Sequence, residues 1–226
     1  MATKTGPNRT SRASLNRERV FSAAMAIADK DGIEAVTMRR LGEELGVEAM
    51  SLYHHVQDKD EILAGMTDAF VREIDEPTGA LDWKAKIRAR AMTARKLARR
   101  HRWAPHLLAS PRHLSLTALH YQEWVLARLL EGGLSNQLAH SAMHIVGSRT
   151  LGFSQELSGV GDDAPETAGK ILKSIDLAEF PVIAQAIKGV HHDEDAEFAF
   201  GLDLILDGLE RARDAEASPR RRRARR

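Results

Sequence analysis

The side chains that suggest a chemistry lie close together between residues 48 and 56. Leu52 and Val56 are four residues apart, which predicts a short helix with these two side chains in the core. The opposite face then presents apolar, aromatic and imidazole groups rather than the Lys and Glu of an ordinary solvated surface. These outward residues are Ala49, Met50, Tyr53 and His54. Such a face suits contact with base edges and thymine methyl groups, so the pattern predicts a DNA-reading helix.

A second short helix precedes this one and would position it. Thr37 is a good N-cap, and Leu41 and Leu45 follow at helical spacing. Gly46 can adopt the left-handed conformation that ends a helix. Two short helices joined by a tight glycine-containing turn predict a helix-turn-helix.

Two further helices flank this motif. Asn16 is a candidate N-cap for a helix that continues to about Lys30. Asp58 is a candidate N-cap for a helix through Ile74, and Glu61, three residues later, would complete a reciprocal capping pair.

The rest of the chain also has helical periodicity, and no segment shows sustained strand alternation. Helices are expected over 83–102, between Pro105 and Pro111, and over 113–131, 135–158, 164–190 with a break near Pro181, and 193–214. We therefore predict an all-α fold, with an N-terminal three-helix helix-turn-helix domain followed by a larger helical domain.

Composition and charge narrow the function classes. The 226 residues are 43% hydrophobic and 29% charged and contain no Cys, which excludes disulfide and thiolate chemistry and fits a cytoplasmic protein. No apolar run is long enough for a membrane span, and the N-terminus lacks the apolar block of a signal peptide. The net charge is only +1, although both ends are strongly basic. The body between them is therefore acidic, and only the ends and their neighbourhood should approach a polyanion.

The region from Val20 to Leu63 resembles the DNA-binding domain of the tetracycline-repressor (TetR) family. The motifs are A-A-x-x-I-A-x-x-D-G, V-T-M-R-R-L, L-G-V and S-L-Y-H-H-V-x-D-K. A weaker resemblance, F-x-F-G-L-D-L-I-L-D-G-L from Phe198 to Leu209, is to the last helix of the subgroup closest to the tetracycline repressor itself. The resemblance implies a homodimeric, small-molecule-responsive transcriptional regulator, expected to be a repressor, that binds a palindromic double-stranded DNA operator.

The family resemblance also assigns DNA contacts. It implies that Arg39 reaches DNA and that Tyr53 and Lys59 contact phosphates; the ordinary alternative for Arg39 is a solvated basic residue. Ala49 and Met50 stand where close relatives often have Gln and Pro. Since Ala cannot bond an adenine edge, we expect apolar readout there. The full predicted set is Thr37, Arg39, Ala49, Met50, Ser51, Tyr53, His54, His55 and Lys59.

The same resemblance places an effector pocket among the middle helices and a dimer interface on the last long helices. Candidate pocket residues, each of which could equally be ordinary core, are Trp103, His106, Leu107, Trp124, Met143, His144 and Phe153. Candidate interface residues are Val146, Thr150, Phe153, Gly201, Leu204, Ile205 and Gly208. The two glycines are seven residues apart, which indicates either close approach of another helix or simply weak helix propensity.

We expect no metal, no cofactor and no enzymatic activity. His140 and His144 are four residues apart, a spacing that can hold a metal, but no third ligand is evident from the sequence. The run 191–194, His-His-Asp-Glu, fits a loop and N-cap. No nucleophile elbow, phosphate loop or HExxH pattern occurs.

The expected organisation is a disordered basic arm (1–14), the helix-turn-helix domain (15–60), a helical ligand-binding and dimerisation domain (61–216) and a disordered basic tail (217–226). The tail is either a solvated end or a non-specific phosphate tether. Two other functions stay open: a non-specific architectural DNA-binding protein, and a helical ligand-sequestering protein with no DNA role.

Overall fold

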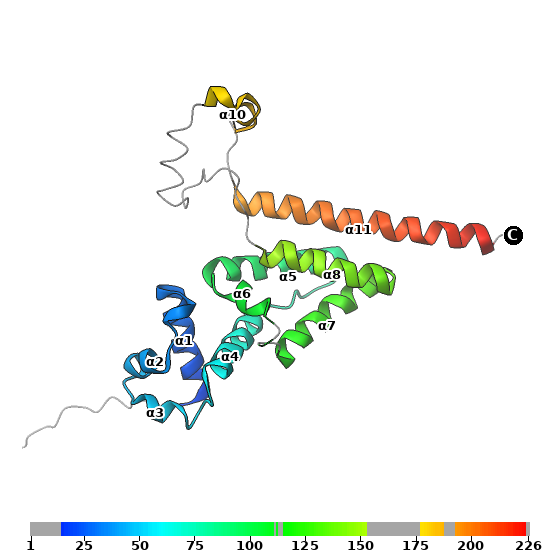
Figure 1. Cartoon of the computed structure of the whole chain (residues 1–226). Coiled ribbons are helices and arrows are strands. Elements are labelled where there is room, and N and C mark those ends of the chain that lie inside the picture. The colour runs from blue at the N-terminus through cyan, green and yellow to red at the C-terminus, as the bar shows by residue number, and fades with distance from the viewer. Residues whose placement is uncertain (1–14, 111, 113–114, 153–176, 188–192, 225–226) are drawn as a thin grey trace, which may run out of the picture. The chain divides into compact units, whose positions relative to one another are not determined.

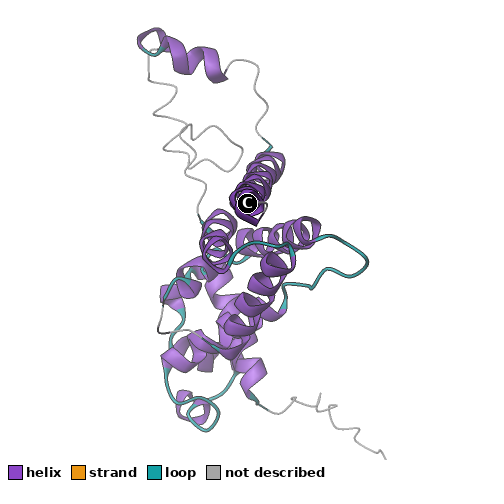
Figure 2. Ribbon diagram, turned by 90° about the vertical axis from the view of Figure 1, so that its right-hand side faces the viewer, coloured by secondary structure: helices purple, strands orange, loops and turns teal. Residues whose placement is uncertain are grey.

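The computed structural model describes residues 15–110, 112, 115–152, 177–187 and 193–224 (Figure 1). Every regular element in these ranges is a helix, and they contain no strand (Figure 2). The predicted all-α fold is therefore confirmed. The chain forms two compact units, one of residues 1–76 with 95–124 and the other of residues 77–94 with 125–226. The predicted domain boundary at residue 60 falls inside the first unit, at the start of a helix.

The first unit contains the helix-turn-helix. Its elements are α1 (Arg17–Asp31), the 3-10 helix η1 (Ile33–Ala35), α2 (Met38–Leu45), α3 (Ala49–Leu52), α4 (Lys59–Arg72), α6 (Ala104–Leu108), the end of α5 (Trp83–Arg100) and the start of α7 (Leu116–Glu131). α1 packs against α2 and α4. The buried core residues that these helices share are Val20, Ala24, Ile27, Leu41, Leu52, Val56, Ile62, Met66 and Phe70.

Short polar side chains fix where these helices begin. Asn16, Thr37 and Asp58 each accept a hydrogen bond from the backbone N–H three residues later, at 2.9, 3.1 and 2.8 Å. All three N-cap predictions are confirmed. The carboxylate of Glu61 accepts at 2.6 Å from the backbone N–H of Gln57, one residue before the N-cap that the reciprocal pair predicts.

A polar cluster joins α1 to the segment that links α5 and α6. The Asp29 Oδ1 accepts from Trp103 Nε1 at 2.7 Å and lies 2.8 Å from His101 Nδ1. Because an ionised carboxylate only accepts, the ring nitrogen of His101 is the donor. Both rings are buried, and the Phe70 ring of α4 meets each edge-on with centroids 6.2 Å apart. The cluster therefore connects α1, α4 and the start of α6 within one unit.

The second unit is built on two long helices. It contains the start of α5 (Trp83–Arg100), the end of α7 (Leu116–Glu131), α8 (Asn136–Leu151), η3 (Leu177–Glu179), α10 (Pro181–Ile187) and α11 (Glu194–Ala224). α8 packs against α11. Buried residues of these two helices are Ala139, Ala142, Val146, Thr150, Phe198, Leu202, Leu206 and Leu209.

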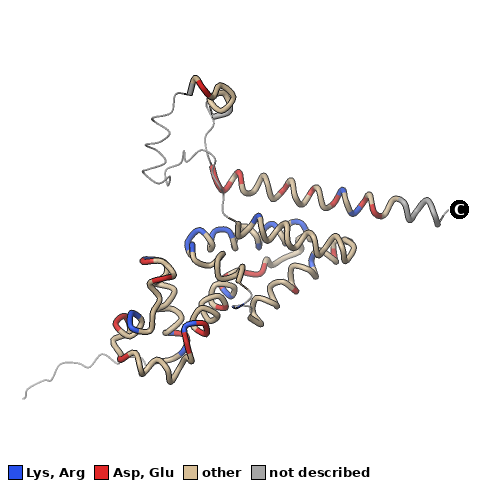
Figure 3. Tube along the Cα trace, viewed as in Figure 1, with Lys and Arg blue, Asp and Glu red and all other residues tan. Residues whose placement is uncertain are grey.

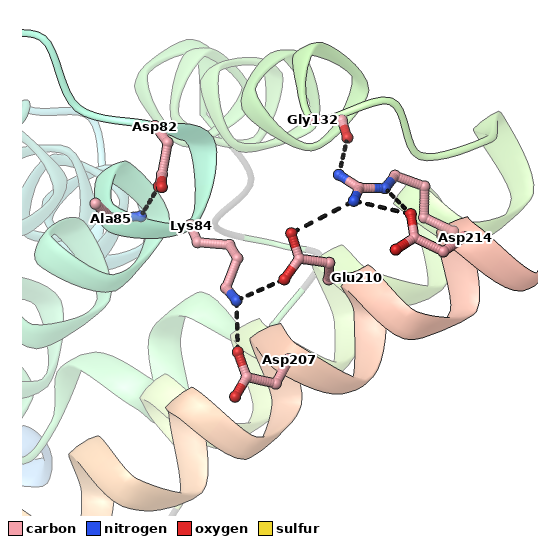
Figure 4. Close-up of polar contacts among 8 residues, drawn as sticks. Asp82, Lys84, Ala85, Gly132, Asp207, Glu210 and Asp214 are labelled. Carbon is pink, nitrogen blue, oxygen red and sulfur yellow. Dashed lines mark hydrogen bonds and ion pairs between the residues drawn. The ribbon is translucent and has the colours of Figure 1, made fainter.

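Ion pairs join the start of α5 to α11. Lys and Arg recur along α5, while α11 carries acidic residues (Figure 3). Lys84 Nζ donates to Asp207 Oδ1 at 2.5 Å and to Glu210 Oε2 at 3.0 Å (Figure 4). Hydrogen bonding to Asp207 raises the pKa of Lys84, and the same bond lowers the pKa of Asp207. Arg213 donates to the Gly132 carbonyl at 2.8 Å, which fixes α11 against the turn after α7.

Several predicted helix ends are wrong. α4 ends at Arg72 and α5 at Arg100. α8 ends at Leu151 instead of near residue 158, because Gly152 is extended at φ −65° and ψ 148°. α11 continues past residue 214 to Ala224, so the predicted disordered tail begins in helical backbone.

Two predicted segments lie wholly or mostly outside the described residues. These are the arm 1–14 and the helix expected over 164–190. Within that expected helix, α10 begins at Pro181, the position of the predicted break. None of the described helices has the length and apolarity needed to cross a membrane.

Candidate nucleic-acid interface

The α3 segment presents a mixed apolar and aromatic surface, which we call the reading face: Ala49, Met50, Tyr53 and His54. Leu52 and Val56 are fully buried, whereas the exposed fraction is 71% for Met50 and 48% for Tyr53. His54 is also exposed, and Ala49 is half-buried. The predicted outward orientation is therefore what the structure shows. The helix itself is shorter than expected, since α3 ends at Leu52 and residues 53–55 form a turn.

Two glycines set how α3 lies on α2. Gly46 is left-handed at φ 67°, which ends α2 as predicted. Gly42 is buried, and a Cβ there would lie 2.8 Å from the Val47 carbonyl oxygen and 3.2 Å from the Ala49 nitrogen. The close approach of the two helices therefore requires Gly at position 42. The sequence interpretation missed this residue, although a second glycine four residues before Gly46 was a visible signal.

The two arginines of α2, Arg39 and Arg40, are paired with carboxylates of the same unit. Arg39 Nη1 lies 2.9 Å from Glu43 Oε1, one helical turn later, and Arg39 is exposed. Arg40 lies between 3.5 and 3.9 Å from carboxylates on Asp31, Glu43 and Glu44. Exposed pairs of this kind contribute little to stability, so a phosphate can compete for Arg39 at small cost.

Arg17 is a second residue that sequence reasoning missed. Its guanidinium pairs with the Glu61 carboxylate, donates to the His55 carbonyl at 3.4 Å and lies over the Phe21 ring at 5.7 Å. Arg17 thereby links the first turn of α1 to the turn between α3 and α4. The available signal was a basic residue directly after a helix N-cap.

The nine predicted DNA-contact residues all belong to the first unit. Thr37 and Arg39 are at the start of α2, Lys59 is the first residue of α4, and the others occupy α3 and the following turn. The Thr37 hydroxyl is already used as the cap of α2. Their contact with DNA stays a prediction.

The predicted pocket residues divide between the two units. In the first, Trp103 and Leu107 are buried, Trp124 is half-buried and His106 is exposed. The Trp103 indole N–H is satisfied by Asp29, which fits the ordinary core reading. In the second unit Met143 is half-buried and His144 is exposed, with its ring centroid 4.7 Å from that of His140. Phe153 lies outside the described residues.

The predicted interface residues also differ in exposure. Val146 and Thr150 are buried by their own chain, and the Thr150 hydroxyl donates to the Val146 carbonyl. The exposed fraction of Leu204 is 53%, and Ile205 and Gly208 are half-buried.

Gly201 has a neighbour within its own chain. A Cβ at this position would lie 2.8 Å from Arg149 Nη2, so the close neighbour of Gly201 is the guanidinium of Arg149, a side chain of α8. At Gly208 the nearest atom is Arg211 Nη2, at 4.0 Å.

Among the described residues, α8 and α11 expose three large apolar side chains, which we call the outer apolar set: Ile145, Phe200 and Leu204. The sequence interpretation found only Leu204. Helical periodicity selected the inward positions of α8, and the second Phe of the F-x-F motif was the available signal for Phe200.

Comparison with known proteins decides the family. The model of the tetracyclin repressor-like C-terminal domain matches residues 76–213, and that of the tetR family of bacterial regulatory proteins matches residues 20–66. The chain belongs to the TetR family. TetR proteins are helix-turn-helix transcriptional regulators, and accordingly the chain is a regulator and not an enzyme.

Named TetR relatives match over most of the chain. The HTH-type transcriptional repressor DrrR1 of Streptomyces coeruleorubidus is 32% identical over 217 residues, covering 90% of this chain and 80% of DrrR1. The class D tetracycline repressor protein of Escherichia coli is 29% identical over 208 residues, which cover 88% of this chain and 90% of that repressor. The solved structure of Streptomyces coelicolor ActR in complex with actinorhodin superposes with a TM-score of 0.67 at 27% sequence identity. The match covers 87% of this chain and 96% of the ActR chain. The family resemblance seen in the sequence is confirmed.

Proposed function

We propose that this TetR protein is a homodimeric repressor that binds a palindromic DNA operator through α3 and releases it when a small-molecule effector binds. The observation that carries the proposal is the reading face. It is exposed and apolar or aromatic, and it is held in place by the capped helices α2 and α4. An exposed surface of this composition suits major-groove base edges better than water.

The need for a second copy follows from the size of α3. A helix of four residues presents few side chains and reaches few base pairs, so useful specificity requires two copies on one operator. Half-sites are then about 34–36 Å apart, or a multiple of that spacing. The outer apolar set supports a homodimer through α8 and α11, because exposed Phe and Leu on long helices suit helix-to-helix association.

The coupling between effector and DNA is supported by the cluster around Asp29. Phe70, near the end of α4, contacts the rings of His101 and Trp103, and α4 begins with Lys59 beside the reading face. An effector that moves Trp103 or α6 therefore acts on both α4 and α1. DNA release requires that the effector bind the two conformations with different affinity.

The effector is proposed to be a small apolar or aromatic molecule. The structure of ActR was solved in complex with actinorhodin. DrrR1 is named as a transcriptional repressor, and the Escherichia coli relative is named as a tetracycline repressor protein. The pocket candidates stay Trp103, His106, Leu107, Trp124, Met143, His144 and Phe153. A melting-temperature screen against metabolites and antibiotics would identify the effector, because a ligand that binds only the native state raises its stability.

The proposal is tested by gel shift with DNA that flanks the gene of this protein, in the presence of excess competitor DNA. The double variant Arg39→Ala, Tyr53→Ala is expected to weaken the complex about tenfold or more and to reduce the salt dependence of binding. Arg72→Ala, which removes an exposed Arg at the other end of α4, is the matched control and should bind as the wild type does.

Three results would refute the proposal. Equal binding by the double variant and the wild type would show that the reading face does not contact DNA. Equal competition by any DNA sequence would favour an architectural protein, and no retention of DNA at all would favour a ligand-sequestering protein.

A further inference from the structure

We propose that α3 selects a 5-methylpyrimidine, thymine in ordinary DNA, through the Met50 side chain, and that Glu48 beside it selects a base with an exocyclic amino group. The inference rests on the proposed function and names the chemistry by which the reading face distinguishes operators.

Met50 is free to contact a base because the core does not need it. Leu52 and Val56 fill the space beneath α3, while 71% of Met50 is exposed. Its thioether is flexible and polarisable and is at most a weak hydrogen-bond acceptor. It therefore distinguishes bases through apolar contact, and in the major groove only thymine offers a methyl group.

The other side chains of α3 supply less apolar contact than Met50 and no base-specific hydrogen bond. Ala49 has no polar side-chain group, Leu52 is buried, and Ser51 has only a half-buried hydroxyl, which bonds to several bases without distinguishing them. No residue of α3 has the amide or guanidinium needed for a bidentate bond to adenine or guanine. The discrimination that α3 makes directly is therefore centred on Met50.

Glu48 adds a second preference at the edge of the same surface. It precedes α3, is exposed, and makes no side-chain capping bond. Its carboxylate accepts hydrogen bonds and does not donate them. In the major groove, cytosine and adenine offer an amino group, whereas guanine offers two acceptors. Glu48 thus favours C or A and disfavours G at the base that it faces.

Loss of one methyl contact has a predictable size. Burying one methyl-sized group is worth about 0.8 kcal/mol, which corresponds to about fourfold in affinity at one half-site. A two-fold symmetric operator contains the contact twice, so removing both methyl groups should weaken binding about fifteenfold.

The test begins with selection of the preferred sequence from a random DNA library by the full-length wild-type protein. Each thymine of the selected sequence is then replaced by deoxyuridine, which removes only the 5-methyl group, and affinities are measured by gel shift. The wild type should lose about fourfold per half-site at one symmetric thymine position. Met50→Ala should bind thymine and deoxyuridine there equally, and 5-methylcytosine should bind the wild type more tightly than cytosine does.

The controls separate a base contact from a general effect. Leu116→Ala removes another exposed apolar side chain, on α7, and should keep the deoxyuridine sensitivity of the wild type. Glu48→Gln should accept G at the neighbouring position that the wild type rejects. Circular dichroism and thermal melting of each variant verify that it is folded.

The possible failures are distinguishable. Selection of a defined sequence with no thymine sensitive to deoxyuridine overturns the inference and leaves the proposed function intact. Equal deoxyuridine sensitivity in Met50→Ala and wild type overturns the assignment to Met50. Failure to select any sequence overturns the proposed function itself.

Discussion

Two of the surfaces on which this protein exposes apolar side chains, the reading face and the outer apolar set, differ in what surrounds them. The reading face is one helical turn and the residues after it, where Met50 and Tyr53 alternate with polar neighbours such as His54. The outer apolar set lies on helices of 16 and 31 residues. An apolar contact bordered by hydrogen-bonding groups suits a DNA groove, whereas apolar residues on long helices suit a second copy of the chain. The exposure of an apolar side chain therefore does not by itself indicate the kind of partner, whereas its polar neighbours and the length of its helix do.

The two surfaces are also held differently. The helices around the reading face are fixed by N-caps and by a close approach at Gly42. The long helix α11 is fixed by ion pairs to α5 and by packing on α8. Local backbone chemistry positions the first surface, and contacts between segments far apart in the sequence position the second.

The largest expected effect comes from placing charge on the outer apolar set. In the double variant Phe200→Glu, Leu204→Glu, burial of the introduced carboxylates at the proposed interface should separate the proposed dimer. Operator affinity should fall toward the non-specific level, about 1,000-fold or more weaker. Both side chains are exposed in the single chain, so circular dichroism should be unchanged. Light scattering measures the mass; a persistent dimer would show that these residues do not form the interface.

A smaller effect is expected from cavity formation beneath the reading face. Leu52 is fully buried, so Leu52→Ala should lower the free energy of unfolding by about 2–5 kcal/mol. Met50→Ala, two residues away, should change it by no more than about 0.5 kcal/mol, because that side chain is exposed. Urea denaturation of both variants makes the comparison. A large loss for Met50→Ala would mean that Met50 is part of the core.

The smallest effect is expected from the ion pair between Lys84 and Asp207. Lys84 holds the pKa of Asp207 below its ordinary value of 3.8, so the stability it contributes is present above that pH and is lost as pH falls through the lowered pKa. The pKa of Lys84 is raised above 10.5, so its contribution is present below that pH and is lost as pH rises through the raised pKa.

Asp207 is solvent-exposed and Lys84 is half-buried, and salt should therefore weaken the pair. A double-mutant cycle with Lys84→Met and Asp207→Asn measures its coupling energy at neutral pH, at low pH and at high salt. A coupling energy that does not decrease at low pH would contradict the ionic origin of this interaction.

The helix-turn-helix was predictable because its determinants are local. Thr37, Asp58 and Gly46 act within three or four residues of their own positions, and each does what its type and place indicate. The end of α8 was not predictable in this way, since Gly152 is extended and interrupts an apolar pattern that would otherwise continue.

Contacts between distant segments were not predictable either. Periodicity indicates that one side of a helix is apolar, but it does not tell which apolar residues its own chain will cover. Val146 is covered and Ile145 is not, although they are adjacent in the sequence. Likewise nothing in the sequence around Asp29 indicates that its partners are 72 and 74 residues away.

That carboxylate has a consequence for anyone who wishes to exchange DNA-binding modules among TetR proteins. Asp29 accepts from two donors contributed by residues 101 and 103, which lie well beyond the helix-turn-helix in the sequence. A hybrid that transplants only the N-terminal module into a protein without equivalent donors would lose both of these hydrogen bonds, each of which contributes about 0.5–1.5 kcal/mol. The portable unit is therefore discontinuous, and it must bring His101 and Trp103 with it.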